Sequence, residues 1–139
     1  MSKEGVVIIL EDRSGCIAMQ LRDDRLDVVA AGQWGLFGGW IESNESPRDA
    51  VVREVEEELN CALKVSKLSL LESRSINWGV PPDVFMMSTH VFHYPVTTEC
   101  DHAVLNEGQA FRFMQPIDLK DKWVVPHHWA ILNDYWRTK

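Results

Sequence analysis

Three glutamates stand at helical spacing near the middle of the chain. Glu54, Glu57 and Glu58 occupy positions i, i+3 and i+4, which project from one face of a helix with about 3.6 residues per turn. Carboxylates packed this closely repel one another, and a compensating cation relieves the repulsion. Ligands that are all oxygen atoms suit a hard divalent ion such as Mg²⁺ or Mn²⁺. The alternative is a solvated acidic helix face, because acid-rich helices are common.

The residues around this triplet fit the same chemistry. Arg53 precedes Glu57 by one helical turn, so it is able to brace that carboxylate from within the helix. Glu45 lies just before the helix, where its carboxylate approaches the same cluster or favours the positive helix end. Gly38 and Gly39 let the backbone turn sharply and come close to a ligand.

The whole pattern resembles the Nudix box, G-x5-E-x7-R-E-U-x-E-E-x-G-U, in which U is apolar. The defined positions are matched by Gly39, Glu45, Arg53, Glu54, Val55, Glu57, Glu58 and Cys61. Asn60 departs from the pattern, because the family has glycine there. Asparagine is the best replacement for glycine in a left-handed backbone conformation, so we expect little damage to the box.

The resemblance implies an α/β fold, an α/β/α sandwich with a mixed central sheet, and hydrolysis of a nucleoside diphosphate linked to another group. It implies that the metal ligands are Glu54, Glu57 and Glu58, with Gly39 contributing through its carbonyl. Arg53 takes the position of the residue that orients these carboxylates, and Glu45 that of a supporting glutamate. Small members of this family are often homodimers, so the resemblance also raises a homodimer as an expectation.

Residues outside the box are candidates for the remaining steps. The general base is either a box glutamate, Glu57 or Glu58, or Glu107, which lies on a polar loop before a strand. A solvent-exposed loop acid is an equally good interpretation of Glu107. Arg22 follows a strand toward the expected cleft and is suited to phosphate, although neighbouring aspartates also allow a local ion pair. Trp78, on a loop with glycine and proline, is a candidate for substrate contact.

The best helix in the sequence carries the box. It is predicted over residues 47–59, because Ser46 is a good N-cap and Pro47 fits the first helical position. Its apolar stripe consists of Val52, Val55 and Leu59. Asn60 favours the left-handed conformation that often ends a helix.

The other elements are predicted from apolar patterns and turn residues. Strand-like segments lie at residues 6–10, 16–21, 34–37, 63–71, 84–94 and 110–114, with a loop at 77–82. Pro126 opens a final helix whose stripe is Trp129, Leu132 and Trp136. His127 and His128, at the start of this helix, are expected at the surface or in a capping role. Strands on both sides of a central helix indicate a mixed α/β or α+β sandwich, and residues 1–139 are expected to form one domain.

The composition limits the kinds of partner and compartment that we expect for this protein. The formal net charge is −7 and no basic patch is visible, which argues against binding a nucleic acid polymer. No apolar run reaches membrane-spanning length, and no signal peptide is recognisable at the N-terminus, so a cytoplasmic location without a membrane is expected. The odd number of cysteines and their wide spacing disfavour disulfides and a zinc site.

Two functions from different classes follow. The leading hypothesis is metal-dependent hydrolysis of a diphosphate (pyrophosphate) linkage in a small nucleotide-like substrate, such as a (d)NTP or a nucleotide sugar. The alternative is a catalytically silent nucleotide-binding or regulatory module on the same fold, which would be expected to lack box carboxylates. An isomerase of a prenyl diphosphate ranks lower, because the cysteines lie in no matching motif. Loops outside the box determine the substrate.

Overall fold

The computed structural model describes residues 3–139. Its elements in chain order are β1 (Lys3–Glu11), β2 (Ile17–Leu21), β3 (Trp34–Gly35), β4 (Phe37–Trp40), α1 (Pro47–Leu59), the 3₁₀ turn η1 (Val65–Lys67), β5 (Ser69–Trp78), β6 (Phe85–Pro95), β7 (Ala110–Met114), α2 (Pro116–Leu119) and α3 (Pro126–Arg137).

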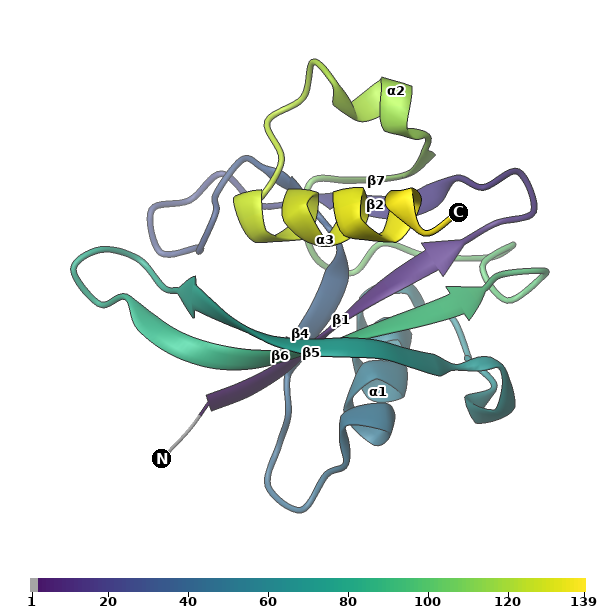
Figure 1. The fold of residues 1–139 in the computed structure, drawn as a ribbon, viewed down its shortest axis with the longest axis horizontal. Coiled ribbons are helices and arrows are strands. Elements are labelled where there is room, and N and C mark those ends of the chain that lie inside the picture. Colours follow the sequence, from purple (N-terminus) through teal and green to yellow (C-terminus); the bar gives the residue numbers. More distant parts are fainter. Residues whose placement is uncertain (1–2) are drawn as a thin grey trace.

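One mixed sheet lies at the centre of the molecule (Figure 1). Its main path runs β3-β2-β1-β6-β5, while β4 pairs with β1 and β7 pairs with β2. The β1–β6 pair is parallel, and the other named pairs are antiparallel. The predicted mixed sheet is therefore confirmed.

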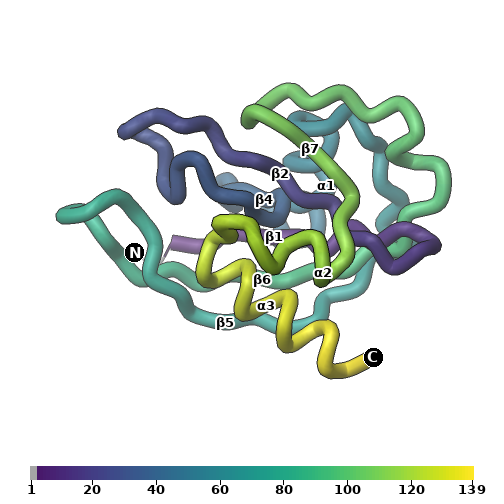
Figure 2. The backbone as a smooth tube through the Cα atoms, turned by 90° about the horizontal axis from the view of Figure 1, so that it is seen from above, coloured from purple at the N-terminus to yellow at the C-terminus, as the bar shows by residue number. Residues whose placement is uncertain are grey.

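Two apolar clusters cover the two faces of the sheet. Along β1, Val6 and Ile8 belong to the cluster that includes α1, whereas Val7 and Ile9 belong to the cluster that includes α3. This alternation follows from the period of two in a strand. Figure 1 and Figure 2 show α1 and α3 on opposite sides of the sheet. The predicted α/β/α layering is thus observed.

Helix α1 begins and ends where its sequence predicts. The Ser46 hydroxyl accepts a hydrogen bond of 3.1 Å from the Asp49 backbone N–H, and Asn60 has φ 56°. The residue that opens the helix is Pro47, as expected. The buried stripe differs slightly from the predicted one, because Val51 is fully buried and Val52 is only half-buried.

Several predicted boundaries are wrong. Residues 34–37 are divided between β3 and β4, and β4 continues through Gly38 and Gly39 to Trp40. Residues 63–71 do not form one strand, because Leu63 and Leu68 pack on the α1 side of the core around the η1 turn. Strand β5 starts only at Ser69 and continues through Asn77 and Trp78, which were expected on a loop. Pairing with β6 extends it, since Trp78 stands opposite Phe85 in the register.

Cys16, Cys61 and Cys100 are free thiols in the structure. Cys61 and Cys100 are distant in sequence, but their Sγ atoms lie 3.2 Å apart. Within the described range 3–139, none of the helices combines the length and the apolar character needed to cross a bilayer.

Candidate functional site

A cavity of about 510 Å³ lies beside the N-terminal half of β1 and the C-terminal half of α1. All the candidate site residues line it: Arg22, Gly39, Arg53, Glu54, Glu57, Glu58, Trp78 and Glu107. Arg22, Trp78 and Glu107 lie outside the box, so the fold brings these three to the same cavity as the box residues.

The two glycines of β4 allow this strand to approach α1. A Cβ on Gly39 would lie 2.3 Å from the carboxyl carbon of Glu54, and one on Gly38 would lie 2.0 Å from the Val6 carbonyl oxygen. The Gly38 backbone also hydrogen-bonds the Glu58 carboxylate. The expected sharp turn at these glycines is wrong, because both lie within β4 and neither has a positive φ. Their backbone instead approaches two of the box glutamates.

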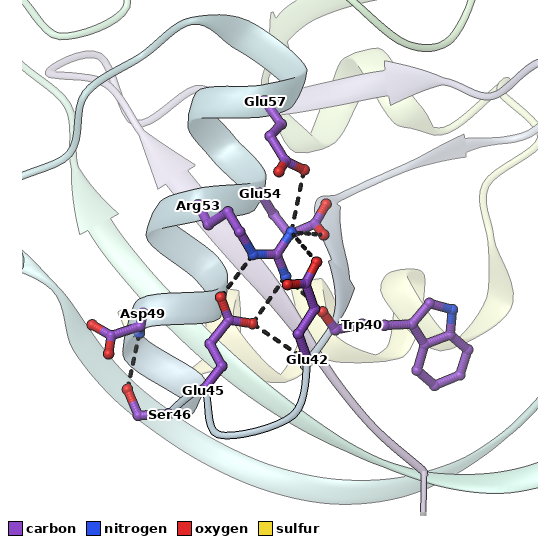
Figure 3. Close-up of polar contacts among 8 residues, drawn as sticks. All are labelled: Trp40, Glu42, Glu45, Ser46, Asp49, Arg53, Glu54 and Glu57. Carbon is purple, nitrogen blue, oxygen red and sulfur yellow. Dashed lines mark hydrogen bonds and ion pairs between the residues drawn. The ribbon is translucent and has the colours of Figure 1, made fainter.

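Arg53 gathers the carboxylates around one guanidinium group (Figure 3). It donates to Glu45 at 2.7 Å, to Glu54 at 2.8 Å and to Glu57 at 3.2 Å. A further bond of 2.9 Å reaches the Trp40 carbonyl oxygen. The hydrogen bonds from Arg53 lower the pKa of Glu45 to about 2. Arg53 thus braces Glu57 as predicted, but its shorter bonds go to Glu45 and Glu54.

Glu58 is the most confined carboxyl of the group. Burial, followed by repulsion from the Glu54 and Glu107 carboxylates, raises the pKa of Glu58 to about 9. Its Oε1 atom is buried and has no hydrogen-bond partner among the described residues. Burial is also the main cause that raises the pKa of Glu54. Negative charge is therefore poorly compensated at this point in the cavity.

These residues fit a hard divalent cation by their chemistry. The donor set is all oxygen, and a positive ion would relieve both the repulsion and the orphaned Oε1 of Glu58. In residues 3–139, however, no three histidine, cysteine or acidic side chains converge tightly enough to form a finished metal site. Figure 3 shows that the Glu54 and Glu57 carboxylates both point toward the Arg53 guanidinium.

Glu107 is held beside the box glutamates by its neighbours. Asn106 donates from its backbone to the Glu58 carbonyl at 2.9 Å and from its side chain to the Glu57 carbonyl at 2.9 Å. On the other side, Gln20 donates to the Glu107 carbonyl at 2.7 Å. The loop is thus fastened to both α1 and β2. Glu107 is exposed, yet it lines the same cavity as Glu54 and Glu58.

Arg22 and Trp78 meet in the same cavity. The Arg22 guanidinium lies 5.6 Å from the Trp78 ring centroid, and its Nε donates to the Val29 carbonyl at 2.7 Å. Burial lowers the pKa of Arg22. Trp78 reaches the cavity from the end of β5 rather than from a loop.

His128 is a lining residue that sequence reasoning missed. It is 5% exposed, and its Nδ1 accepts a bond of 2.9 Å from the Leu36 N–H, so the expected surface position is wrong. The buried residues of α3 are His128, Ile131 and Leu132, a spacing of three and four. The sequence contains this spacing too. The predicted apolar stripe was instead Trp129, Leu132 and Trp136, because it was placed on the large aromatic residues.

Fold and site together define an α/β protein whose acidic cavity is suited to a hard cation. The family model described as the NUDIX domain matches residues 1–135, and the chain belongs to this family of hydrolases. It is similar to the CTP pyrophosphohydrolase of Escherichia coli (strain K12), with 31% identity over 90 residues. That alignment covers 65% of this chain and 61% of the relative.

Other relatives agree on the fold over a greater length. The nucleoside triphosphatase NudI of Escherichia fergusonii is 26% identical over 117 residues and covers 80% of each chain. The E. coli dihydroneopterin triphosphate pyrophosphohydrolase has a TM-score of 0.76 at 15% identity, covering 100% of this chain and 99% of that one. This last likeness bears on the fold alone.

Proposed function

We propose that this protein hydrolyses a diphosphate linkage in a nucleoside diphosphate derivative, such as a (d)NTP or a nucleotide sugar, with Mg²⁺ or Mn²⁺. The observation that carries the proposal is the poorly compensated carboxyl group of Glu58, whose Oε1 is buried without a partner among the described residues. The names of the relatives, a CTP pyrophosphohydrolase and a nucleoside triphosphatase, support this substrate class.

Under this proposal, Glu54, Glu57, Glu58 and the Gly39 carbonyl would hold the cation. Once bound, the cation supplies positive charge that offsets the phosphate charge and acidifies water. Arg53 sets the orientation of Glu54 and Glu57 through its hydrogen bonds. Water then attacks phosphorus, and the diphosphate bond to the leaving group breaks.

The proton of the attacking water needs an acceptor, and Glu107 is our candidate. Its loop is fastened to α1 and to β2, so its carboxylate stays near Glu54 and Glu58, in keeping with its lining the same cavity. Glu57 and Glu58 are the alternatives. Glu57 is the more accessible of the two, with 59% of its side chain exposed.

Arg22 is suited to bind a phosphate group of the substrate. Guanidinium groups pair well with phosphate oxygens, and desolvation strengthens such a pair. Trp78, which lies against Arg22, would keep the guanidinium in place and contribute one wall to the substrate.

The test is hydrolysis of a panel of (d)NTPs, nucleotide sugars and dinucleoside polyphosphates, with Mg²⁺, with Mn²⁺ and with a chelator, and with products identified by mass. Glu57→Gln should abolish turnover and leave the fold intact. Glu56→Gln is the matched control, because Glu56 is an exposed neighbour that does not line the cavity. Nucleotide binding with no turnover under either metal would instead favour a silent binding module.

A further inference from the structure

The cavity has a second end whose chemistry differs from that of the carboxyl cluster. It is formed on the α3 side of the sheet by Val7, Leu36, Ile76, Met87, Thr89 and His128. Among these six residues, Thr89 and His128 carry the polar side chains, and the Trp78 ring is stacked on His128 with the ring centroids 6.1 Å apart. Thr89 and His128 are therefore candidates to recognise the part of a ligand that enters this end.

The protonation state of His128 follows from its surroundings. Burial lowers the pKa of His128 to about 3, so the ring is neutral at physiological pH. Its Nδ1 accepts the Leu36 N–H at 2.9 Å, so the single ring proton must reside on Nε2. No hydrogen bond to Nε2 is found among residues 3–139. His128 thus offers one N–H donor of fixed position beside the cavity.

Thr89 carries the second unused group. It lies on β6, directly beside Gly5 of β1 in the parallel register, and it is 1% exposed. Its Oγ1 is buried and lacks a hydrogen-bond partner in the described chain. A buried hydroxyl without a partner costs folding free energy. Thr89 also lines the cavity, so a bound ligand could supply the missing partner.

We propose that Thr89 and His128 determine specificity by reading the hydrogen-bonding edge of a planar, uncharged heterocycle, the base of a nucleotide, at this end of the cavity. The proposal rests on the proposed function, because the phosphates are taken to lie at the carboxyl end. A base fits better than a second sugar, since this end is lined mainly by apolar side chains and by the aromatic rings of Trp78 and His128. The His128 Nε2–H donates to a ring nitrogen or carbonyl oxygen, and the Thr89 hydroxyl donates or accepts beside it.

The test measures binding rather than turnover, using the intact protein with Mg²⁺. The probes are α,β-methylene analogues of nucleoside triphosphates with each of the four bases, and inorganic tripolyphosphate, which has no base. Thr89→Val removes the hydroxyl and keeps the shape, and Thr89→Ser restores the hydroxyl. His128→Asn keeps an acceptor for the Leu36 N–H but removes the donor at Nε2, while His128→Gln extends a donor to that position.

The expected result is a loss of about tenfold in affinity for at least one nucleoside analogue in Thr89→Val and in His128→Asn. Affinity for tripolyphosphate should stay unchanged, and Thr89→Ser and His128→Gln should recover much of the loss. Without ligand, Thr89→Val should raise the midpoint of thermal unfolding by about 3 °C, because it removes an orphaned polar group. A threonine with a purely structural role would not show both effects.

Three outcomes would overturn the inference. The first is equal affinity of the wild-type protein for tripolyphosphate and for every nucleoside analogue. The second is unchanged binding of all analogues in Thr89→Val and His128→Asn, and the third is an equal loss for tripolyphosphate. These outcomes can be distinguished from failure of the proposed hydrolysis. In that case the protein would bind nucleoside analogues in a base-dependent way but would hydrolyse none of the natural compounds.

Discussion

Replacing Gly39 with alanine should damage the carboxyl cluster while leaving the fold intact. The added Cβ would lie 2.3 Å from the carboxyl carbon of Glu54 and 2.4 and 2.5 Å from its two oxygens. Non-bonded carbon contacts are comfortable only near about 3.5 Å, so the carboxylate must move by about 1 Å. A misplacement of about 1 Å in a catalytic group can lower the rate by about 100-fold. Glu54 would also lose its 2.8 Å bond to Arg53.

The neighbouring glycine provides a contrast within the same strand. A Cβ on Gly38 would meet the Val6 carbonyl oxygen at 2.0 Å, and Val6 is part of the β1–β4 pairing. Backbone in a paired strand cannot yield as a side chain does, so Gly38→Ala should cost about 3 kcal/mol or more. Gly39→Ala should cost less than about 1 kcal/mol, because the clash is with the end of a flexible side chain.

Both variants would be compared in kcat/KM with Mg²⁺ and in urea unfolding followed by circular dichroism. We expect Gly39→Ala to keep a wild-type unfolding midpoint and lose about 100-fold in kcat/KM, and Gly38→Ala to lose stability. Wild-type turnover by Gly39→Ala would refute the reasoning, since it would mean that the position of Glu54 does not matter to the reaction. Equal destabilisation of the two variants would refute the distinction between backbone and side-chain clashes.

Three further predictions concern the carboxyl cluster. Arg53→Lys keeps the charge but loses the forked bonds to Glu45 and Glu54, so kcat/KM should fall by about 10- to 100-fold; a loss below twofold would contradict this. Without metal, the free energy of unfolding measured with urea should be lower at pH 8 than at pH 5.5. The reason is that Glu58 has a pKa of about 9 in the folded protein. Between these pH values the folded protein keeps a proton that the unfolded chain releases near pH 4.5. Glu58→Gln or added Mg²⁺ should reduce the dependence of the unfolding free energy on pH. If Glu58→Gln shows the same dependence as the wild-type protein, then other titratable groups cause it. Glu107→Gln should lower kcat by about 100-fold with little change in KM if Glu107 is the base, and a wild-type kcat would leave that role to Glu57 or Glu58.

The sequence by itself determined helix α1 and the grouping of its glutamates. Ser46, Pro47 and Asn60 act within one turn of the helix ends, so neighbours in sequence supply all the interactions that set its bounds. The spacing of Glu54 and Glu58 on one face also follows from helical geometry alone. The layered fold could be predicted in outline, because strand and helix patterns alternate locally.

Tertiary structure decided which distant residues share the cavity. Residues 65–67 form a turn rather than part of a strand, because Leu63 and Leu68 pack into the apolar cluster that includes α1, which no local pattern encodes. The face of α3 that packs inward carries His128, which accepts a hydrogen bond from the Leu36 N–H. The sequence prediction placed the tryptophans on this face instead of His128. Thr89 faces the cavity because of the register between β1 and β6. Register and burial are settled by contacts between segments many residues apart, so only the folded chain brings Thr89 and His128 to the same cavity as the glutamates.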